Sequence, residues 1–373
     1  MMVAVGCAPR TDPHIPTAMT VVKTNWSPVT TFLDSAIAAG AAPGAVLGVS
    51  VAGQRYVYAS GHLTRGEPAL AEPTTVYDLA SLTKVVGLTT AVMLAVDDGK
   101  LELDAPVQRY LPAFEGAGKE RVTIRLLLAH GSGLPAWRPL FQEAETREGA
   151  FAVADTTGLS SPPGTTDAYS DLGMIVLTQV VEAVYHERLD SLLARRIFQP
   201  LGMTSVGFLP AAERARIAPT ELDPWRGRVL RGEVHDENAA RMDGVSGHAG
   251  LFGSAPDLLT FAEWMIGGWY GGASFRRSAV REFTRRQDLV PGSSRALGWD
   301  VPGPGSSAGA FLSATSFGHT GFTGTSLWVD PEHRLAIVLL SNRVNPTRDN
   351  PRWAPVRARV ADLVMTTLFE DAR

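Results

Sequence analysis

The chain has 373 residues, of which 45% are hydrophobic and 19% are charged. This balance is typical of a folded globular protein with a large core, and it excludes a disordered or fibrous chain. The formal net charge of −4, without any Lys/Arg-rich tract, argues against nucleic acid as a partner. A single cysteine, Cys7, excludes an intramolecular disulfide framework.

Residues 1–26 are predicted to form a flexible N-terminal segment ahead of a folded domain over 27–373. Met1–Cys7 is apolar and ends in a small residue followed by cysteine, which faintly resembles the end of a lipoprotein signal. Two interpretations stay open. Cys7 carries a lipid tether on an exported, periplasmic or membrane-tethered protein, or it is a chance cysteine in a disordered start and the protein is cytoplasmic. No apolar stretch reaches the 18 residues of a membrane span.

The first regular elements form a helix and a hairpin. Val29–Ala39 is a plausible helix, and the runs Gly44–Val51 and Gln54–Ala59 are rich in β-branched and aromatic residues. Ala52 and Gly53 separate the two runs, as expected for the turn of an antiparallel hairpin. The domain is therefore predicted to begin with a sheet.

The stretch from Ser81 to about Trp269 is mainly helical in pattern, with long loops rich in Gly and Pro. Its predicted helices are Ser81–Asp98 closing on Gly99, Thr123–Ala129, Asp171–Tyr185, Leu189–Ile197 and Pro256–Met265. Strand patterns return at Gly298–Val301, Gly318–His319, Thr325–Val329 and Leu335–Ser341, followed by a helix over Ala354–Phe369.

This order predicts an α+β fold. Strands from both ends of the chain, within 40–70 and 295–345, can pair into one antiparallel sheet flanked by the terminal helices. Residues 85–290 would then form a mainly helical lobe. A functional cleft is expected between the sheet and this lobe.

Ser81 and Lys84 are the first candidates for chemistry. Residues three apart share a helix face, so the hydroxyl and the amine can meet. Only four of the 34 basic residues are lysines, and burial can lower the pKa of a lysine enough for it to act as a base. The alternative is that Ser81 merely caps the helix while Lys84 extends to solvent.

Three short motifs in order carry a resemblance to a known family. They are Ser81-Leu82-Thr83-Lys84 preceded by Tyr77-Asp78-Leu79-Ala80, then Tyr169-Ser170-Asp171, then His319-Thr320-Gly321. Three segments near these motifs resemble the same family pattern: Leu126–Pro135, Pro163–Thr165 and Leu339–Val344. The series resembles that of class C β-lactamases, DD-peptidases and related esterases, the β-lactamase and penicillin-binding-protein superfamily, over about Ala38 to Phe369.

The resemblance implies a β-lactamase/transpeptidase-like fold and a role for each motif. Ser81 would form an acyl-enzyme, while Lys84 and Tyr169 share the roles of general base and acid. The pKa of Tyr169 would be depressed by the Lys84 ammonium. The backbone N–H groups of Ser81 and Phe322 would form the oxyanion hole. The resemblance implies no metal or organic cofactor.

Two residues depart from the pattern of many relatives. Asp171 stands where they have Asn; when ionised it cannot donate to a substrate amide oxygen, and it would hold Lys84 protonated. His319 stands where they have Lys, so this position offers no permanent charge to a substrate carboxylate. Both departures make efficient β-lactam hydrolysis less expected than ester or cell-wall substrates.

Two further segments carry charged or metal-binding residue types. Val234–Phe252 is predicted to be a polar, Gly-rich loop, whose side chains His235, Asp236, Asn238 and His248 either face the cleft or only hold the loop together. It resembles a segment of penicillin-binding cell-wall proteins and N-acetylmuramoyl-L-alanine amidases, which favours peptidoglycan fragments as substrates. The His235 and His248 spacing matches no standard metal site. Arg276–Arg286 is interpreted as a solvated helix face, and contact with an anionic surface is the alternative.

The sequence thus predicts a serine hydrolase acting through an acyl-enzyme at Ser81 on a cell-wall-derived amide or peptide, or on an ester. Alternatives left open are a penicillin- or muropeptide-binding sensor without turnover, a weak β-lactamase, and a scaffold without catalysis. The sequence does not indicate an oligomeric state.

Overall fold

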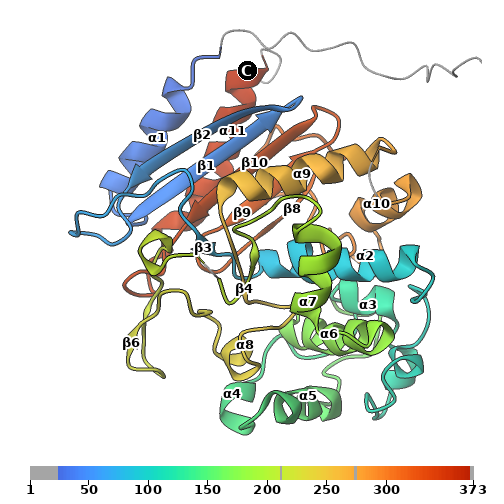
Figure 1. Ribbon diagram of the computed structural model, residues 1–373. Coiled ribbons are helices and arrows are strands. Elements are labelled where there is room, and N and C mark those ends of the chain that lie inside the picture. Colours follow the sequence, from blue (N-terminus) through green and yellow to red (C-terminus); the bar gives the residue numbers. More distant parts are fainter. Residues whose placement is uncertain (1–23, 211, 273–274, 370–373) are drawn as a thin grey trace, which may run out of the picture.

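A five-stranded antiparallel sheet is the centre of the protein (Figure 1). The computed structural model describes residues 24–210, 212–272 and 275–369. The strand order is β2-β1-β10-β9-β8, so strands from the two ends of the chain lie side by side. The strands are β1 (Gly44–Val51), β2 (Gln54–Gly61), β8 (Phe317–Thr320), β9 (Ser326–Asp330) and β10 (Leu335–Ser341). The expected α+β fold is confirmed.

Helices cover both faces of this sheet. On one face, α1 (Ser27–Ala38) packs beside α11 (Ala354–Leu368) over alternate apolar residues such as Leu47. On the other face lies α9 (Ala255–Trp269). Every residue of β1 and β10 is buried, which explains why both strands are almost continuously apolar.

The second lobe is mainly helical and lies beside the β8 end of the sheet (Figure 1). Its helices are α2 (Thr90–Asp97), α3 (Ile124–Leu128), α4 (Leu140–Glu143), α5 (Arg147–Thr156), α6 (Asp171–Tyr185), α7 (Leu189–Leu193), α8 (Glu237–Arg241) and α10 (Arg277–Thr284). Two π-helical segments, Thr83–Thr89 and Ala194–Phe198, and 3₁₀ turns at Val107–Arg109, Lys119–Arg121, Arg214–Arg216 and Pro351–Trp353 complete the helical elements. Small sheets join β3 (Tyr77–Asp78), β7 (Leu251–Gly253) and β4 (Gly207–Phe208), and β5 (Leu222–Asp223) with β6 (Arg228–Val229).

The structure corrects three of the predicted elements. Gly298–Val301 is not a strand, because Asp300 makes only isolated bridges. The helix expected over Ser81–Asp98 is a π-helix over Thr83–Thr89 that continues as α2. Val234–Phe252 is not wholly a loop, since it contains α8 and the start of β7. The hairpin of β1 and β2 and the bounds of α6 agree with the sequence prediction.

The predictions for Cys7 and for most of the N-terminal segment concern residues outside those the structure describes. Among the helices of the described ranges, none has the length and apolarity needed to cross a membrane.

A buried pair of ionisable residues lies inside the helical lobe, away from the sheet. The Lys119 ammonium donates to the backbone carbonyl of Asp155 and lies 4.4 Å from the centre of the Phe114 ring. The Asp155 carboxylate accepts a 2.7 Å hydrogen bond from Gln179 Nε2. Burial raises the pKa of Asp155 to about 6, against the opposing effect of Gln179 and Lys119.

Replacing Asp155 with Asn should therefore stabilise the protein at neutral pH. A carboxyl group whose pKa is raised on folding contributes its full stability to the folded protein only below its pKa in the unfolded chain. For Asp155 this contribution is lost as the pH rises through its folded pKa of about 6. Asn keeps the acceptor for Gln179 without the charge. The gain in unfolding free energy should grow between pH 4 and 6.5 to about 2 kcal/mol, measured by denaturant unfolding. Asp288→Asn, on the surface, should show no such trend. A pH-independent effect of Asp155→Asn would contradict the assignment.

Candidate active site

Ser81 lies at a strained turn between β3 and the π-helix. Asp78, the last residue of β3, accepts a 2.8 Å hydrogen bond from the Ala80 N–H through its carboxylate. Ala80 has a φ of +47°, a left-handed conformation that a residue other than Gly or Asn adopts at a cost. This turn places Ser81 at the start of the helical segment that contains Lys84.

Lys84 is fully buried, and three acceptors surround its amine. Nζ lies 3.0 Å from Ser81 Oγ, 2.9 Å from the His248 carbonyl oxygen and 2.7 Å from Asp171 Oδ1. An ammonium has three N–H donors and no acceptor, so Lys84 donates hydrogen bonds to Ser81 Oγ and to the His248 carbonyl and forms an ion pair with Asp171. The alternatives in which Lys84 extends to solvent or Ser81 only caps a helix do not describe this arrangement.

The protonation state of Lys84 corrects one expectation from the sequence. Burial lowers its pKa, but the charge of Asp171 and the hydrogen bonds to Asp171 and Tyr169 outweigh burial and raise the pKa above the ordinary value. The sequence suggested a depressed pKa through burial alone. The structure agrees instead with the prediction that Asp171 holds Lys84 protonated.

Tyr169 lies directly over this lysine. Lys84 Nζ is 4.8 Å from the centre of the phenol ring. Burial and Asp171 raise the pKa of Tyr169, against the opposing effect of Lys84. The depressed pKa expected from the sequence is therefore wrong, because desolvation of a phenolate exceeds the attraction of one ammonium. Tyr169 is a neutral phenol in this state and can serve as a proton donor.

His319 stands on the edge strand β8, on the other side of Tyr169. Its Nδ1 lies 2.7 Å from the Thr320 carbonyl oxygen. Because a carbonyl only accepts, Nδ1 carries the proton and Nε2 keeps a lone pair. Nε2 is buried without a partner among the described residues. Burial lowers the pKa of His319, so this side chain offers no permanent charge.

Gly321 and Phe322 follow β8 and pass close to the Ser81 turn. A Cβ at Gly321 would lie 2.5 Å from the Leu79 carbonyl oxygen, so only glycine permits this approach. Within the described part of the chain, neither the Ser81 N–H nor the Phe322 N–H donates to another group. Both are available to an oxygen atom bound beside Ser81.

Two residues around Tyr169 were not singled out from the sequence. The His130 ring lies 4.6 Å from the Tyr169 ring, and its Nδ1 accepts a 3.0 Å hydrogen bond from the Ser170 N–H. Burial lowers the pKa of His130 well below the ordinary value. The Arg295 guanidinium lies 5.3 Å from the Tyr169 ring centre. His130 lies in Leu126–Pro135, a segment that resembles the family pattern, and this resemblance could have indicated His130 as a site residue. No local sequence pattern indicates Arg295.

Two pockets meet at Ser81. The His319 pocket, about 380 Å³, is lined by Ser81, Tyr169, Arg295, Asp300, His319, Thr320, Gly321, Phe322, Arg343 and Arg357. The His248 pocket, about 250 Å³, is lined by Ala80, Ser81, Trp137, Tyr169, Asp171, His235, Asp236, Glu237, His248, Ala249, Phe322 and Arg348. Ser81, Tyr169 and Phe322 line both pockets. Phe322 is 49% exposed.

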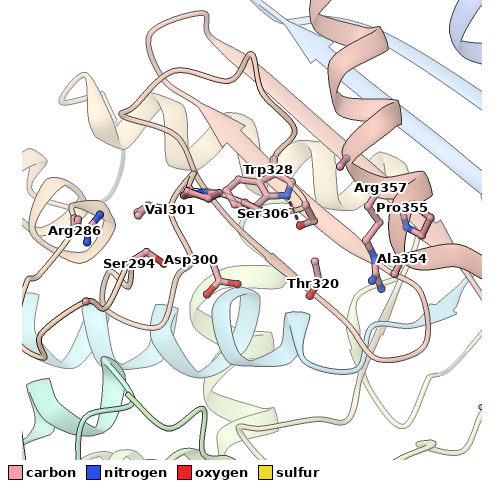
Figure 2. A pocket seen from close by; sticks show the side chains of 16 residues that line it. Arg286, Ser294, Asp300, Val301, Ser306, Thr320, Trp328, Ala354, Pro355 and Arg357 are labelled. Carbon is pink, nitrogen blue, oxygen red and sulfur yellow. Dashed lines mark hydrogen bonds between the residues drawn. The ribbon is translucent and has the colours of Figure 1, made fainter. Parts of the chain in front are cut away.

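A larger groove of about 790 Å³ lies next to the His319 pocket (Figure 2). The two share Asp300, Thr320 and Arg357 as lining residues. Figure 2 shows Arg357 reaching from α11 toward Thr320. Ser81 therefore stands where the His248 and His319 pockets meet, and the groove beside β8 and the start of α11 shares part of its wall with the His319 pocket.

The segment 234–252 is placed only partly as the sequence suggested. His235, Asp236 and His248 line the His248 pocket. His248 Nε2 lies 2.8 Å from Asp236 Oδ1, and His235 Nε2 lies 2.8 Å from Glu221 Oε2. The two imidazoles thus contact different carboxylates, and no set of three or more metal-ligating side chains occurs in the described ranges.

Asn238 does not face the cleft. It is buried, its Oδ1 accepts a 3.0 Å hydrogen bond from the Phe141 N–H, and its Nδ2 donates to the Arg138 carbonyl at 2.9 Å. These two bonds attach α8 to α4 and to the loop before α4. Within Arg276–Arg286, Arg276 pairs with Asp97 and Arg285 pairs with Glu282, as expected for a solvated helix face.

Comparison with known proteins identifies the family of this chain. The Beta-lactamase family profile matches residues 29–362. A putative D-alanyl-D-alanine carboxypeptidase of Salmonella agona is 33% identical over 324 residues, which cover 77% of this chain and 74% of that protein. A class C β-lactamase from Rhodobacter sphaeroides has a similar structure, with a TM-score of 0.70 and 22% identity over 92% of this chain and all of that one. The structure of EstCE1, a hydrolase with promiscuous acyltransferase activity, is also similar, with a TM-score of 0.70 and 23% identity. The match covers 89% of this chain and 97% of EstCE1. The chain therefore belongs to the Beta-lactamase family, and it is a serine hydrolase.

Proposed function

We propose that the protein is a serine carboxypeptidase that cleaves the terminal residue from peptides with a free carboxylate, such as peptidoglycan stem peptides that end in D-alanyl-D-alanine. The observation that carries the proposal is a pair of guanidiniums beside the nucleophile. Arg343 and Arg357 both line the His319 pocket, and within the described residues neither forms an ion pair with a carboxylate. The name of the Salmonella agona relative supports the same substrate class.

These guanidiniums are anchored by backbone carbonyls and leave charge available. Arg343 Nε donates to the Phe322 carbonyl at 2.8 Å, and Arg357 donates to the Gly321 carbonyl at 2.6 Å. Arg357 Nε is buried without a partner among the described residues. Burial and the neighbouring Arg343 lower the pKa of Arg357 to about 10, so it stays charged at neutral pH. A substrate carboxylate would accept charge-assisted hydrogen bonds from the guanidiniums of both Arg343 and Arg357.

In the proposed reaction, Lys84 first loses a proton to solvent water, because the ammonium cannot accept another proton. Ser81 Oγ then attacks the peptide carbonyl carbon while its proton moves to Lys84 Nζ, 3.0 Å away. The carbonyl oxygen becomes an oxyanion that accepts from the N–H groups of Ser81 and Phe322.

The intermediate then collapses. The C–N bond breaks, the leaving nitrogen takes the proton of the Tyr169 phenol, and Lys84 returns a proton to Tyr169. In the second half, water attacks the acyl-enzyme and gives its proton to the Lys84–Tyr169 pair as the ester bond breaks. Ser81 Oγ recovers a proton and the acid is released.

Charge removal at Arg357 tests the carboxylate site. Arg357→Gln should lower kcat/KM for a D-Ala-D-Ala peptide by roughly 10- to 100-fold, because a charge-assisted hydrogen bond contributes about 1.5–3 kcal/mol. It should leave the same peptide with an amidated C-terminus unaffected. Arg359→Gln, on the exposed side of the same helix, is the matched control. Equal losses on both substrates would contradict a carboxylate site.

An esterase is the second candidate, and Asp171 favours it. Its carboxylate binds Lys84 and offers no donor for a substrate amide oxygen. Turnover of an activated ester without release of D-alanine from peptides would establish this candidate. A stable stoichiometric adduct without turnover would instead identify a binding protein.

A further inference from the structure

The two proposed oxyanion donors lie on segments that no β-ladder joins. Ser81 follows β3, which pairs with β7, whereas Phe322 follows β8, which pairs with β9. Backbone ladders alone therefore do not set the position of one N–H relative to the other.

Two buried threonine hydroxyls make the direct connection. Thr323 Oγ1 donates to the Asp78 carbonyl at 2.7 Å, and Thr325 Oγ1 donates to the Leu79 carbonyl at 2.9 Å. Both threonine side chains are essentially inaccessible. Consecutive carbonyls of the turn before Ser81 are thus held by the turn that carries Phe322.

The surrounding contacts make this connection tight. The Gly321 N–H donates to the Thr325 carbonyl at 2.8 Å, which closes the turn around Phe322. A Cβ at Gly321 would lie 2.1 Å from Thr325 Oγ1. On the opposite side, the Asp78 carboxylate accepts from the N–H groups of Ala80, at 2.8 Å, and His235, at 2.6 Å. Asp78 is therefore held at its carbonyl and at its side chain.

We propose that Thr323 and Thr325 are positioning residues that fix the distance and direction of the Ser81 and Phe322 N–H groups. This inference rests on the proposed acyl-enzyme chemistry. An oxyanion hole works because its donors are in place before charge develops, and small displacements of such groups are costly in rate. Neither threonine touches the reacting atoms; each acts through the backbone it holds.

Valine at either position tests the proposal, because it keeps the shape of threonine and removes the hydroxyl. Thr325→Val should lower kcat by roughly 10- to 100-fold, somewhat less than the loss of a whole oxyanion donor, with KM changed less than twofold. Affinity for a boronic acid that mimics the tetrahedral intermediate should fall in parallel with kcat. Thr323→Val should behave alike, and Ser at either position, which restores the hydroxyl, should recover most of both losses.

A matched control separates positioning from stability. Thr284 is equally buried, and its Oγ1 donates to the Val280 carbonyl at 2.8 Å, in α10. Thr284→Val should lower the melting temperature about as much as Thr325→Val but leave kcat and boronic acid affinity unchanged. Wild-type kcat in Thr325→Val, or an increase in KM alone, would overturn the inference.

Labelling of Ser81 by a fluorophosphonate keeps this test independent of the substrate. If the wild-type enzyme reacts and Thr325→Val reacts at least tenfold more slowly, the inference holds whatever the natural substrate. If both react at the same rate, the inference fails while the acyl-enzyme chemistry stands. If wild-type Ser81 is not labelled at all, the proposed function itself fails.

Discussion

Replacing Ser81 with Ala is expected to reduce hydrolysis of peptide and ester substrates by roughly 10⁴-fold or more, as for other nucleophiles that act by covalent catalysis. Ser81 supplies the oxygen that becomes acylated, and its Oγ lies 3.0 Å from Lys84 Nζ. The comparison is made by steady-state kinetics on an activated ester and on a D-Ala-D-Ala peptide.

The same substitution should hardly change stability. Lys84 keeps the His248 carbonyl and Asp171 as partners, so the free energy of unfolding should shift by less than about 1 kcal/mol. Ser191→Ala, on the exposed side of α7, is the control and should retain full activity. A folded Ser81→Ala protein that still turns over either substrate would show that Ser81 is not the nucleophile.

Replacing Asp171 with Asn should move the pH dependence of acylation to lower pH. Lys84 must be neutral to accept the Ser81 proton, and Asp171, with Tyr169, raises the pKa of Lys84 against burial. In the wild type, kcat/KM should therefore rise with pH, approaching tenfold per unit, from about pH 6 toward 9. Without the Asp171 charge, the pKa of Lys84 falls, because burial then opposes the ammonium with less compensation.

The expected size of this effect is large. Each unit by which the pKa of Lys84 falls increases the neutral fraction at pH 7 about tenfold, so the variant should be faster than wild type near neutral pH, and its advantage should shrink only at pH values above its own, lowered Lys84 pKa. Asp190→Asn, on α7, should leave the profile unchanged. A variant that is slower at every pH, with an unshifted profile, would show that Asp171 takes a direct part in proton transfer.

Much of this fold could be predicted from local patterns in the sequence. The β1–β2 hairpin has β-branched strands around a Gly-bearing turn, and α6 runs between Asp171 and Tyr185 as the apolar periodicity predicts. Gly298–Val301 has the composition of a strand, but Asp300 pairs only in isolated bridges. A segment forms a strand only if a partner strand pairs with it along its length, and the local sequence does not show whether such a partner exists.

The active site also has features that the sequence predicted and features that it did not. The order of Ser81, Lys84, Tyr169 and His319 could be read from short motifs. The sequence also predicted that Asp171 holds Lys84 protonated, but it did not indicate the His248 carbonyl as an acceptor for Lys84, because that carbonyl comes from a segment distant in the sequence. Arg357 was missed for a similar reason: α11 brings it beside β8 only when the two ends of the chain form one sheet.

The most direct test of the proposed function is mass spectrometry of the enzyme quenched during turnover of an N-acylated peptide that ends in D-Ala-D-Ala. We expect a transient mass increase equal to the acyl part of the peptide, located on the fragment that contains Ser81, together with one D-alanine released per turnover. The adduct should be absent in Ser81→Ala. Release of D-alanine without any adduct on Ser81, or an adduct on another residue, would contradict acyl-enzyme catalysis at Ser81.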